Sequence, residues 1–338
     1  MRIIASFILL SLLAPPAFTQ DAVLINGGVI DGTGKARAVA NVRIRDGKIA
    51  DIGLFKPGAG ETVLDVRGMI VAPGFVDLQT LSPSAIEKDP AAAGLVTKGV
   101  TTAILGSDGA GPYSIEDFML PFDEKPPALN IAMLVGHGTV RRQIMGGDYK
   151  RPASPDEIER MSELVSDAMK QGGFGLGSDL QQEPASFSTA EELKALAKVV
   201  SSFGGTLVIN IRDPKEAIAL ARDAKTPVQV LGATKAALTE IDKARAQKID
   251  IAADSYSYSQ LVTDKTITLE RALQRLSSAP AGRMGLRERG VLKKGAPADV
   301  VVFSPTALAS GMKYVFVNGM MVVKDGQPTD ARPGQALR

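Results

Sequence analysis

Short apolar runs alternate with amphipathic stretches through the middle of the chain. The runs are PGFVDLQT (73–80), TTAILG (101–106), ALNIAMLVG (128–136), GFGLGSD (173–179), TLVINIR (206–212), PVQVLGA (227–233) and KIDIAADSY (248–256). Between them lie segments with helical periodicity, such as 154–172 and 188–205. Near-continuous apolar strands that alternate with helices are typical of a parallel sheet or barrel. Seven strands are predicted, because segment 259–266 is too short for an eighth strand-and-helix unit.

Two of the predicted helices carry clear start signals. Ser154 and Ser188 are each followed three residues later by a glutamate, Glu157 and Glu191, which is the pattern of a capping box. We therefore expect helices to begin immediately after these two serines.

Both ends of the chain have a different pattern, with short strands and Gly-rich turns. Segments 22–34 and 41–53 are followed, far along the chain, by 298–305 and 314–326, and Asp46-Gly47 predicts a hairpin turn. Each half has too few strands to be stable alone. We expect the two ends to pair into one small β-sandwich beside the central domain.

The N-terminal segment predicts export. Arg2 precedes an apolar run over 3–13, and small residues follow before Asp21. This is the pattern of a secretory signal peptide over residues 1–20, too short to span a membrane; a buried N-terminal strand or helix is the alternative. Periplasmic or secreted localisation follows, with no membrane association after cleavage. The chain has no cysteine for a lipid anchor or a disulfide.

Composition narrows the classes of function. The chain of 338 residues is 45% hydrophobic and 22% charged, with 39 basic and 37 acidic residues, as in an ordinary globular protein. No basic cluster with interleaved aromatic residues is present, so nucleic acid is not an expected partner. The chain contains a single histidine, His137.

Many short motifs resemble, in order, those of one enzyme family. They are Pro73–Asp77, Gly99–Thr102, Asn130–Gly146, Gly172–Leu176, Gly204–Gly205, Asn210–Arg212, Asp254–Tyr258, Arg289–Gly295, Ala298–Asp299, Asn318–Gly319 and Arg332–Arg338. Together they resemble the N-acyl-D-amino-acid deacylases, the D-aminoacylase branch of the amidohydrolase superfamily. The resemblance implies a TIM-type barrel with a β-sandwich, zinc, and amide hydrolysis of N-acyl-D-amino acids. We expect a β-sandwich part over 21–72, a degenerate and incomplete or seven-stranded barrel over 73–285, and the rest of the sandwich over 286–338.

The metal positions that the resemblance implies hold other residue types here. The vestigial positions are Gln79, Leu81, Asp108, Asn210 and Gly232. The family's eighth-strand aspartate falls in the missing segment, and a family tyrosine falls on Gln182. Zinc needs several nitrogen, sulfur or oxygen donors, so we expect no zinc or other cofactor and no catalytic residue of the family type.

Several polar residues could still form a ligand site. They are His137, Arg212, Lys235, Asp254, Tyr256 and Tyr258. His137 is interpreted either as an acid or base facing the barrel mouth or as a loop-shaping residue, and Arg212 either as a carboxylate binder or as a structural ion-pair partner. The tyrosines and Lys235 match positions that contact substrate in the family; packing in the core is the alternative for the tyrosines. Ser107, Ser178 and Ser255 lack the sequence context of a serine hydrolase.

Four aspartates at strand ends suggest a second kind of site. Asp77, Asp108, Asp179 and Asp254 could hold a hard cation, or they could cap helices or pair with Arg141, Arg212 or Lys235. Two functions follow. The first is a non-catalytic exported protein that binds a small acidic ligand, a second copy of the chain or a separate hydrolase. The second is a hydrolase of non-peptide C–N bonds that uses a site other than that of the family. A gene product without selected function is the third possibility.

Overall fold

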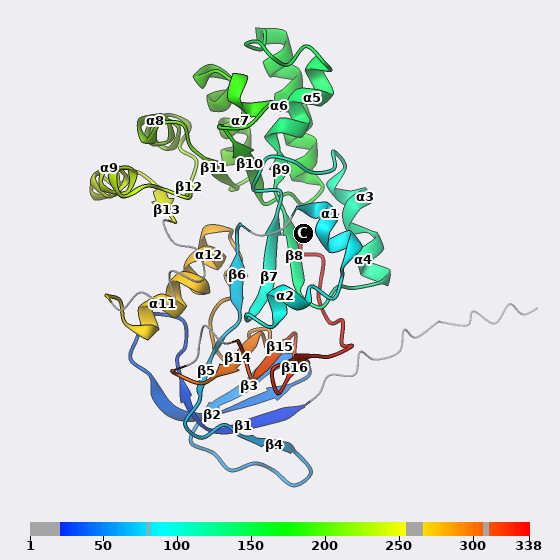
Figure 1. The fold of residues 1–338 in the computed structure, drawn as a ribbon, viewed down its shortest axis with the longest axis vertical. Helices are drawn as coiled ribbons and strands as arrows, with labels where there is room; N and C mark the ends of the chain where they lie inside the picture. The colour runs from blue at the N-terminus through cyan, green and yellow to red at the C-terminus, as the bar shows by residue number, and fades with distance from the viewer. Residues whose placement is uncertain (1–20, 80–81, 255–265, 307–310) are drawn as a thin grey trace, which may run out of the picture.

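The computed structural model describes residues 21–79, 82–254, 266–306 and 311–338. The predicted signal peptide over 1–20 and the candidate residues Leu81, Tyr256 and Tyr258 therefore lie outside the described residues. The described chain forms a β-sheet layer from both chain ends and a second unit of parallel strands with helices around it (Figure 1).

The two chain ends form one continuous sheet where the sequence predicts a sandwich. In the described residues it has nine strands, in the order β17-β16-β15-β14-β5-β1-β2-β3, with β4 paired to β1. The strands are β1 (Ala22–Val29), β2 (Ala38–Arg45), β3 (Lys48–Gly53), β4 (Thr62–Asp65), β5 (Ile70–Pro73), β14 (Val300–Phe303), β15 (Tyr314–Val317), β16 (Met320–Lys324) and β17 (Gln327–Pro328). Antiparallel pairing of β5 with β14 joins the two ends. The hairpin at Asp46-Gly47 is confirmed: both residues have positive φ, 50° and 74°, between β2 and β3.

The central unit consists of parallel strands. They are β6 (Phe75–Asp77), β7 (Val100–Leu105), β8 (Asn130–Met133), β9 (Val135–Gly136), β10 (Gly175–Asp179), β11 (Thr206–Asn210), β12 (Val228–Leu231) and β13 (Ile251–Ala253). In the described residues β6-β7-β8 form one sheet and β13-β12-β11-β10-β9 another. Only Leu134 separates β8 from β9, so the two sheets continue into each other. Within these residues the strand partner of β6 is β7 and that of β13 is β12; β6 and β13 do not pair with each other.

Helices cover the outer side of these strands (Figure 1). They are α1 (Pro83–Lys88), α2 (Ala93–Val96), α3 (Ile115–Met119), α4 (Pro121–Glu124), α5 (His137–Met145), α6 (Pro155–Lys170), η1 (Ala185–Phe187), α7 (Ala190–Ser202), α8 (Pro214–Ala224), α9 (Lys235–Ala246), α11 (Leu269–Leu276) and α12 (Ser278–Arg283). The capping box of Ser154 and Glu157 is confirmed. The cap predicted at Ser188 is wrong by one residue: Thr189 caps α7, because the Ser188 hydroxyl instead donates to the Ala185 carbonyl at 2.6 Å.

Alternate residues of the parallel strands pack into a separate apolar cluster. Val76, Ile104, Leu134 and Val208 lie in it together with Met284, which follows α12. Helices α11 and α12 pack beside β6 (Figure 1). At the far end of α12, the Arg283 carbonyl accepts a 2.6 Å hydrogen bond from Thr206 Oγ1 at the start of β11. Helix α12 therefore contacts β6 and also reaches the start of β11.

The C-terminal segment closes the amino-terminal end of β8. Ile131 donates its backbone N–H to Gln335 at 2.9 Å, and its carbonyl accepts from Leu337 at 2.8 Å. Above this segment the buried pair Arg289–Asp299 contacts Asn130 and Asn318. This polar cluster ties the nine-stranded sheet to the parallel strands.

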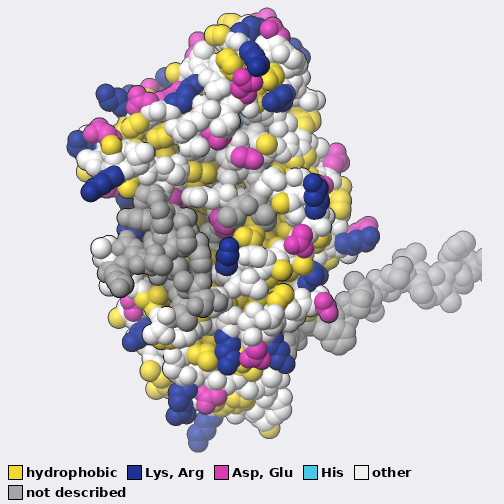
Figure 2. Space-filling model, in the orientation of Figure 1, with side chains coloured by type: hydrophobic (Ala, Val, Ile, Leu, Met, Phe, Trp, Pro, Cys, Tyr) yellow, Lys and Arg dark blue, Asp and Glu magenta, His cyan; other side chains and the backbone are white. Residues whose placement is uncertain are grey.

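The face of the molecule in Figure 2 shows no concentration of one charge. Figure 2 shows basic and acidic side chains intermingled over the visible face. Among the described residues, we find no helix with the length and apolar character needed to cross a bilayer.

Candidate functional site

The predicted metal positions gather at the carboxyl ends of the parallel strands. In the strand register Asp179 lies opposite Asn210, and Asn210 lies opposite Leu231, which precedes Gly232. Asp254 follows β13, and its N–H donates to the Val230 carbonyl at 2.9 Å. This is the end where barrel enzymes place their sites.

Three of the four strand-end aspartates are used in local turns. A carboxylate oxygen of each accepts the backbone N–H two residues later: Asp77 from Gln79 at 2.9 Å, Asp108 from Ala110 at 3.0 Å and Asp179 from Gln181 at 2.9 Å. Asp side chains commonly stabilise turns in this way. Among the residues that the structure describes, no group of three or more His, Cys, Asp or Glu side chains is placed to hold a metal ion. The aspartate cluster that a hard cation would need is therefore not formed there.

The described vestigial positions do not fit zinc. The Asn210 side-chain oxygen accepts from Gln181 Nε2 at 3.2 Å, and the same Gln181 nitrogen donates to the Ile211 carbonyl at 2.8 Å. Gln79 and Gly232 are both exposed, and Gly232 brings no side chain. Neutral amides and one turn-bound carboxylate at Asp108 are poor substitutes for the imidazole, thiolate and carboxylate donors that hold zinc in proteins.

The carboxyl of Asp254 has a raised pKa. Burial raises the pKa of its carboxyl to about 6, and the negative charge of Asp77 adds to the rise. The nearby Arg283 and Arg275 act in the opposite direction, as does a hydrogen bond from Gln229. The carboxyl is therefore partly protonated near pH 6.

His137 lies in a closed polar network that the sequence did not reveal. Its Nδ1 lies 2.7 Å from Ser178 Oγ, and its Nε2 lies 2.8 Å from Glu192 Oε1. All three residues are fully buried. With Nε2 protonated, the ring donates to the carboxylate and accepts the Ser178 hydroxyl proton, so every group is satisfied. Ser178 therefore has a histidine partner, although its sequence context is not that of a serine hydrolase.

Arg141 completes this network one helical turn after His137. It forms an ion pair with Glu192, and its Nη2 donates to the carbonyls of Tyr149 and Arg151, each at 2.9 Å. Burial on its own would raise the pKa of Glu192, but the hydrogen bonds from His137 and Arg141 and the charge of Arg141 lower it below its usual value. Glu192 is therefore a carboxylate, and the network ties α5 to β10, α7 and the loop after α5. The i, i+4 spacing of His137 and Arg141 was the available signal.

The guanidinium of Arg212 is fully hydrogen-bonded to groups of the protein. Its guanidinium donates to Glu216 at 2.6 and 3.3 Å, to the Ser186 carbonyl at 2.9 Å and to the Ser188 carbonyl at 3.3 Å. These bonds use all five of its N–H groups. The geometry matches the structural interpretation of Arg212. Lys235 is exposed at the first position of α9.

A small cavity remains at the mouth of the strands. It measures about 120 Å³ and lies between Asp108, Gly138, Asp179 and Gln182. The loop after β7 limits the space beside it, because a Cβ on Gly177 would lie 2.0 Å from the Gly106 carbonyl oxygen. The cavity has room for a few waters or a very small ligand.

Comparison with known proteins places the fold and the branch. A family model described as "Amidohydrolase family" matches residues 261–330. A D-aminoacylase from Alcaligenes xylosoxydans xylosoxydans is 27% identical over 373 residues, covering 94% of this chain and 76% of the relative. An N-acyl-D-glutamate deacylase from the same organism is 24% identical over 472 residues, covering 94% and 96%. The family model and these relatives support the assignment of the chain to the D-aminoacylase branch of the amidohydrolase superfamily.

Solved structures of this branch share its TIM-barrel-type fold. A D-aminoacylase crystal structure superimposes with a TM-score of 0.87 at 21% identity, covering 94% of this chain and 99% of the other. N-acyl-D-glutamate deacylase from Bordetella bronchiseptica, solved with zinc and a phosphonate inhibitor, gives a TM-score of 0.86 at 24% identity, covering 95% and 100%.

Proposed function

We propose that this chain is a non-catalytic, exported member of the D-aminoacylase branch that acts by binding. The observation that carries the proposal is the donor set at the described metal positions: Gln79, Asp108, Asn210 and Gly232 supply no imidazole and no thiolate. Loss at one position would weaken a zinc site, but loss at all of them removes the means of lowering the pKa of bound water.

The pairing of the parallel strands supports the same proposal. Counting β8 and β9 as one continuous strand, we infer an incomplete barrel of seven strands, because in the described residues β6 and β13 each have one strand partner and α12 packs beside β6. In the family, the catalytic base is the aspartate of the eighth strand. Loss of this base and loss of the metal ligands both favour a chain without catalytic activity. The apolar run over 3–13 supports export.

Zinc content and hydrolysis test the proposal together. We expect protein purified without chelator to carry far less than one zinc per chain, and N-acyl-D-amino acids to be hydrolysed no faster than in buffer. An active D-aminoacylase prepared in parallel is the control. Stoichiometric zinc that survives dialysis, or turnover that co-purifies with the chain, would refute the proposal.

The second candidate is a hydrolase with a site other than that of the family. It is favoured by the spatial arrangement of Ser178, His137 and Glu192, in which the imidazole lies between the hydroxyl and the carboxylate. A hydroxyl, an imidazole and a carboxylate at 2.7 and 2.8 Å are the parts of an activated nucleophile. Their complete burial weighs against access of a substrate. A fluorophosphonate probe that labels the wild type but not Ser178→Ala would establish this candidate; absence of labelling would exclude it.

A further inference from the structure

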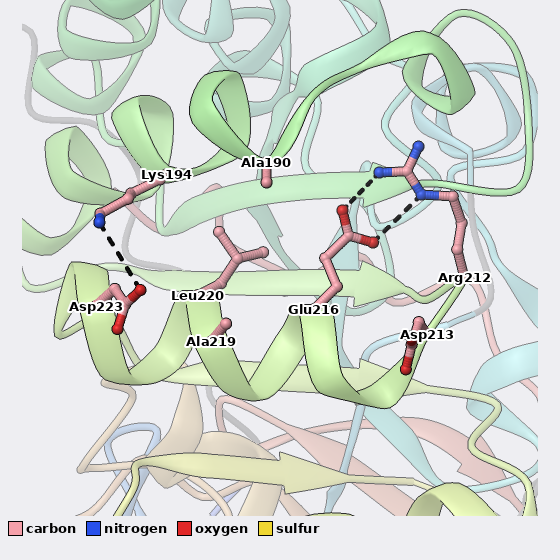
Figure 3. Close-up of a pocket in the computed structure, with 8 residues that line it drawn as sticks. All are labelled: Ala190, Lys194, Arg212, Asp213, Glu216, Ala219, Leu220 and Asp223. Carbon is pink, nitrogen blue, oxygen red and sulfur yellow. Dashed lines mark hydrogen bonds and ion pairs between the residues drawn. The ribbon is translucent and has the colours of Figure 1, made fainter.

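A groove lies between α7 and α8, and none of its lining residues is a metal position. It encloses about 460 Å³, within the range of small-molecule sites. Its apolar lining consists of Ala190 on α7 and of Ala219 and Leu220 on α8, and ion pairs lie at both ends, as Figure 3 shows. The groove therefore offers an apolar centre between two charged ends.

One end presents a lysine with unused hydrogen-bonding capacity. Lys194 Nζ lies 3.8 Å from Asp223 Oδ2, which is too far for a hydrogen bond. Asp223 accepts a hydrogen bond from Arg222 Nε at 2.8 Å, and this bond together with the charges of Arg222 and Lys194 lowers the pKa of Asp223. Lys194 is therefore positioned to donate to an incoming anion at this end.

At the other end of the groove, the group available to a ligand is a hydrogen-bond acceptor, the carboxylate of Asp213. The five N–H groups of Arg212 are used by Glu216 and the carbonyls of Ser186 and Ser188, so this guanidinium is not available to a ligand anion. Asp213 Oδ1 accepts the Lys215 N–H at 2.8 Å as the cap of α8. Its second oxygen retains capacity to accept from a cationic group.

We propose that this groove binds a short peptide with apolar side chains and free termini. The C-terminal carboxylate pairs with Lys194, the apolar side chains lie on Leu220 and its alanine neighbours, and the N-terminal ammonium pairs with Asp213. Asp213 and Asp223 are ten residues apart on α8, or about 15 Å along the axis. An extended peptide of three or four residues spans about 10 to 14 Å, and the long Lys194 side chain covers the difference.

The inference goes beyond the proposed function by naming a ligand class and its site. It does not depend on the metal positions, because no groove residue belongs to them. A chain that lacks zinc and ignores peptides would retain the proposed function and lose this inference. A chain that binds both zinc and peptides would refute the proposed function and leave this inference standing.

Titration calorimetry with Ala-Leu-Leu-Ala tests the site. The wild type should bind this peptide saturably, and Lys194→Gln or amidation of the peptide C-terminus should each weaken binding at least fivefold. Asp213→Asn, which keeps the helix cap, and N-acetylation of the peptide should do the same at the other end. Lys198→Gln is the matched control, because Lys198 is an exposed lysine one turn further along α7 and does not line the groove.

Each alternative result is decisive. Absence of saturable binding at millimolar peptide would overturn the proposal. Equal affinities of the Lys194→Gln and Lys198→Gln variants would do so as well. Retained binding of the acetylated peptide would show that a simple carboxylic acid is enough and would refute the peptide assignment. Circular dichroism of each variant establishes that it is folded.

Discussion

Replacing Asp254 by asparagine should change how stability depends on pH. Burial and the charge of Asp77 raise the pKa of this carboxyl from its ordinary 3.8 to about 6. The folded chain therefore holds the proton more tightly than the unfolded chain. It follows that the contribution of Asp254 to stability is greatest below about pH 4 and falls as the pH rises through 6, since ionised Asp254 is less favourable in the folded state.

The size of the effect follows from the same values. Each unit of pKa difference corresponds to about 1.4 kcal/mol, so a rise from 3.8 to about 6 makes ionised Asp254 cost about 3 kcal/mol of folding stability. Asparagine has nearly the same shape and carries no charge. Asp254→Asn should therefore be more stable than the wild type by up to about 3 kcal/mol at pH 8 and nearly equal to it at pH 4.

Urea unfolding followed by circular dichroism at several pH values between 4 and 8 measures this difference. Asp108→Asn is the matched control: it also neutralises a strand-end aspartate, but that side chain is exposed and the asparagine oxygen still accepts the Ala110 N–H. We expect this control to follow the wild type. Parallel pH curves for Asp254→Asn and the wild type would refute the assignment of a raised pKa to Asp254.

Three further substitutions probe packing. His137→Ala should lower the free energy of unfolding by about 3 kcal/mol or more, because Ser178 and Glu192 lose a partner in a fully buried network; a loss below about 1 kcal/mol would contradict this. Gly334→Ala should destabilise the chain, because the new Cβ would lie 2.0 Å from the Leu129 carbonyl oxygen. Gly94→Ala, with open space around it in α2, should be neutral or stabilising by up to about 1 kcal/mol. Urea denaturation compares the two glycine variants, and equal stability would refute the steric argument.

The sequence predicted features whose determinants are close together in the chain. Apolar runs marked the parallel strands, Asp46-Gly47 marked a hairpin, and Ser154 with Glu157 marked a helix start. The cap at Ser188 failed because two adjacent residues, Ser188 and Thr189, could both serve, and the choice depended on a bond to Ala185.

The buried site could not be predicted because its members are distant in sequence. His137 is 41 residues from Ser178 and 55 from Glu192, and no periodic pattern links them. The turn role of the aspartates at 77, 108 and 179 was open to prediction, since each bond reaches only two residues ahead. The single nine-stranded sheet depends on the pairing of β5 with β14, which local patterns do not specify.

The position of residues 334–337 has a consequence for the order of folding. Their backbone pairs with Ile131 and Pro127 at the start of β8, so this strand gains its last hydrogen bonds only after residue 337 has left the ribosome. The nine-stranded sheet likewise waits for β14 to reach β5. Contacts between segments that are far apart in the chain, such as β5 and β14, form slowly, because a long loop must close first. The start of β8 and the nine-stranded sheet therefore complete their backbone hydrogen bonds only late in synthesis.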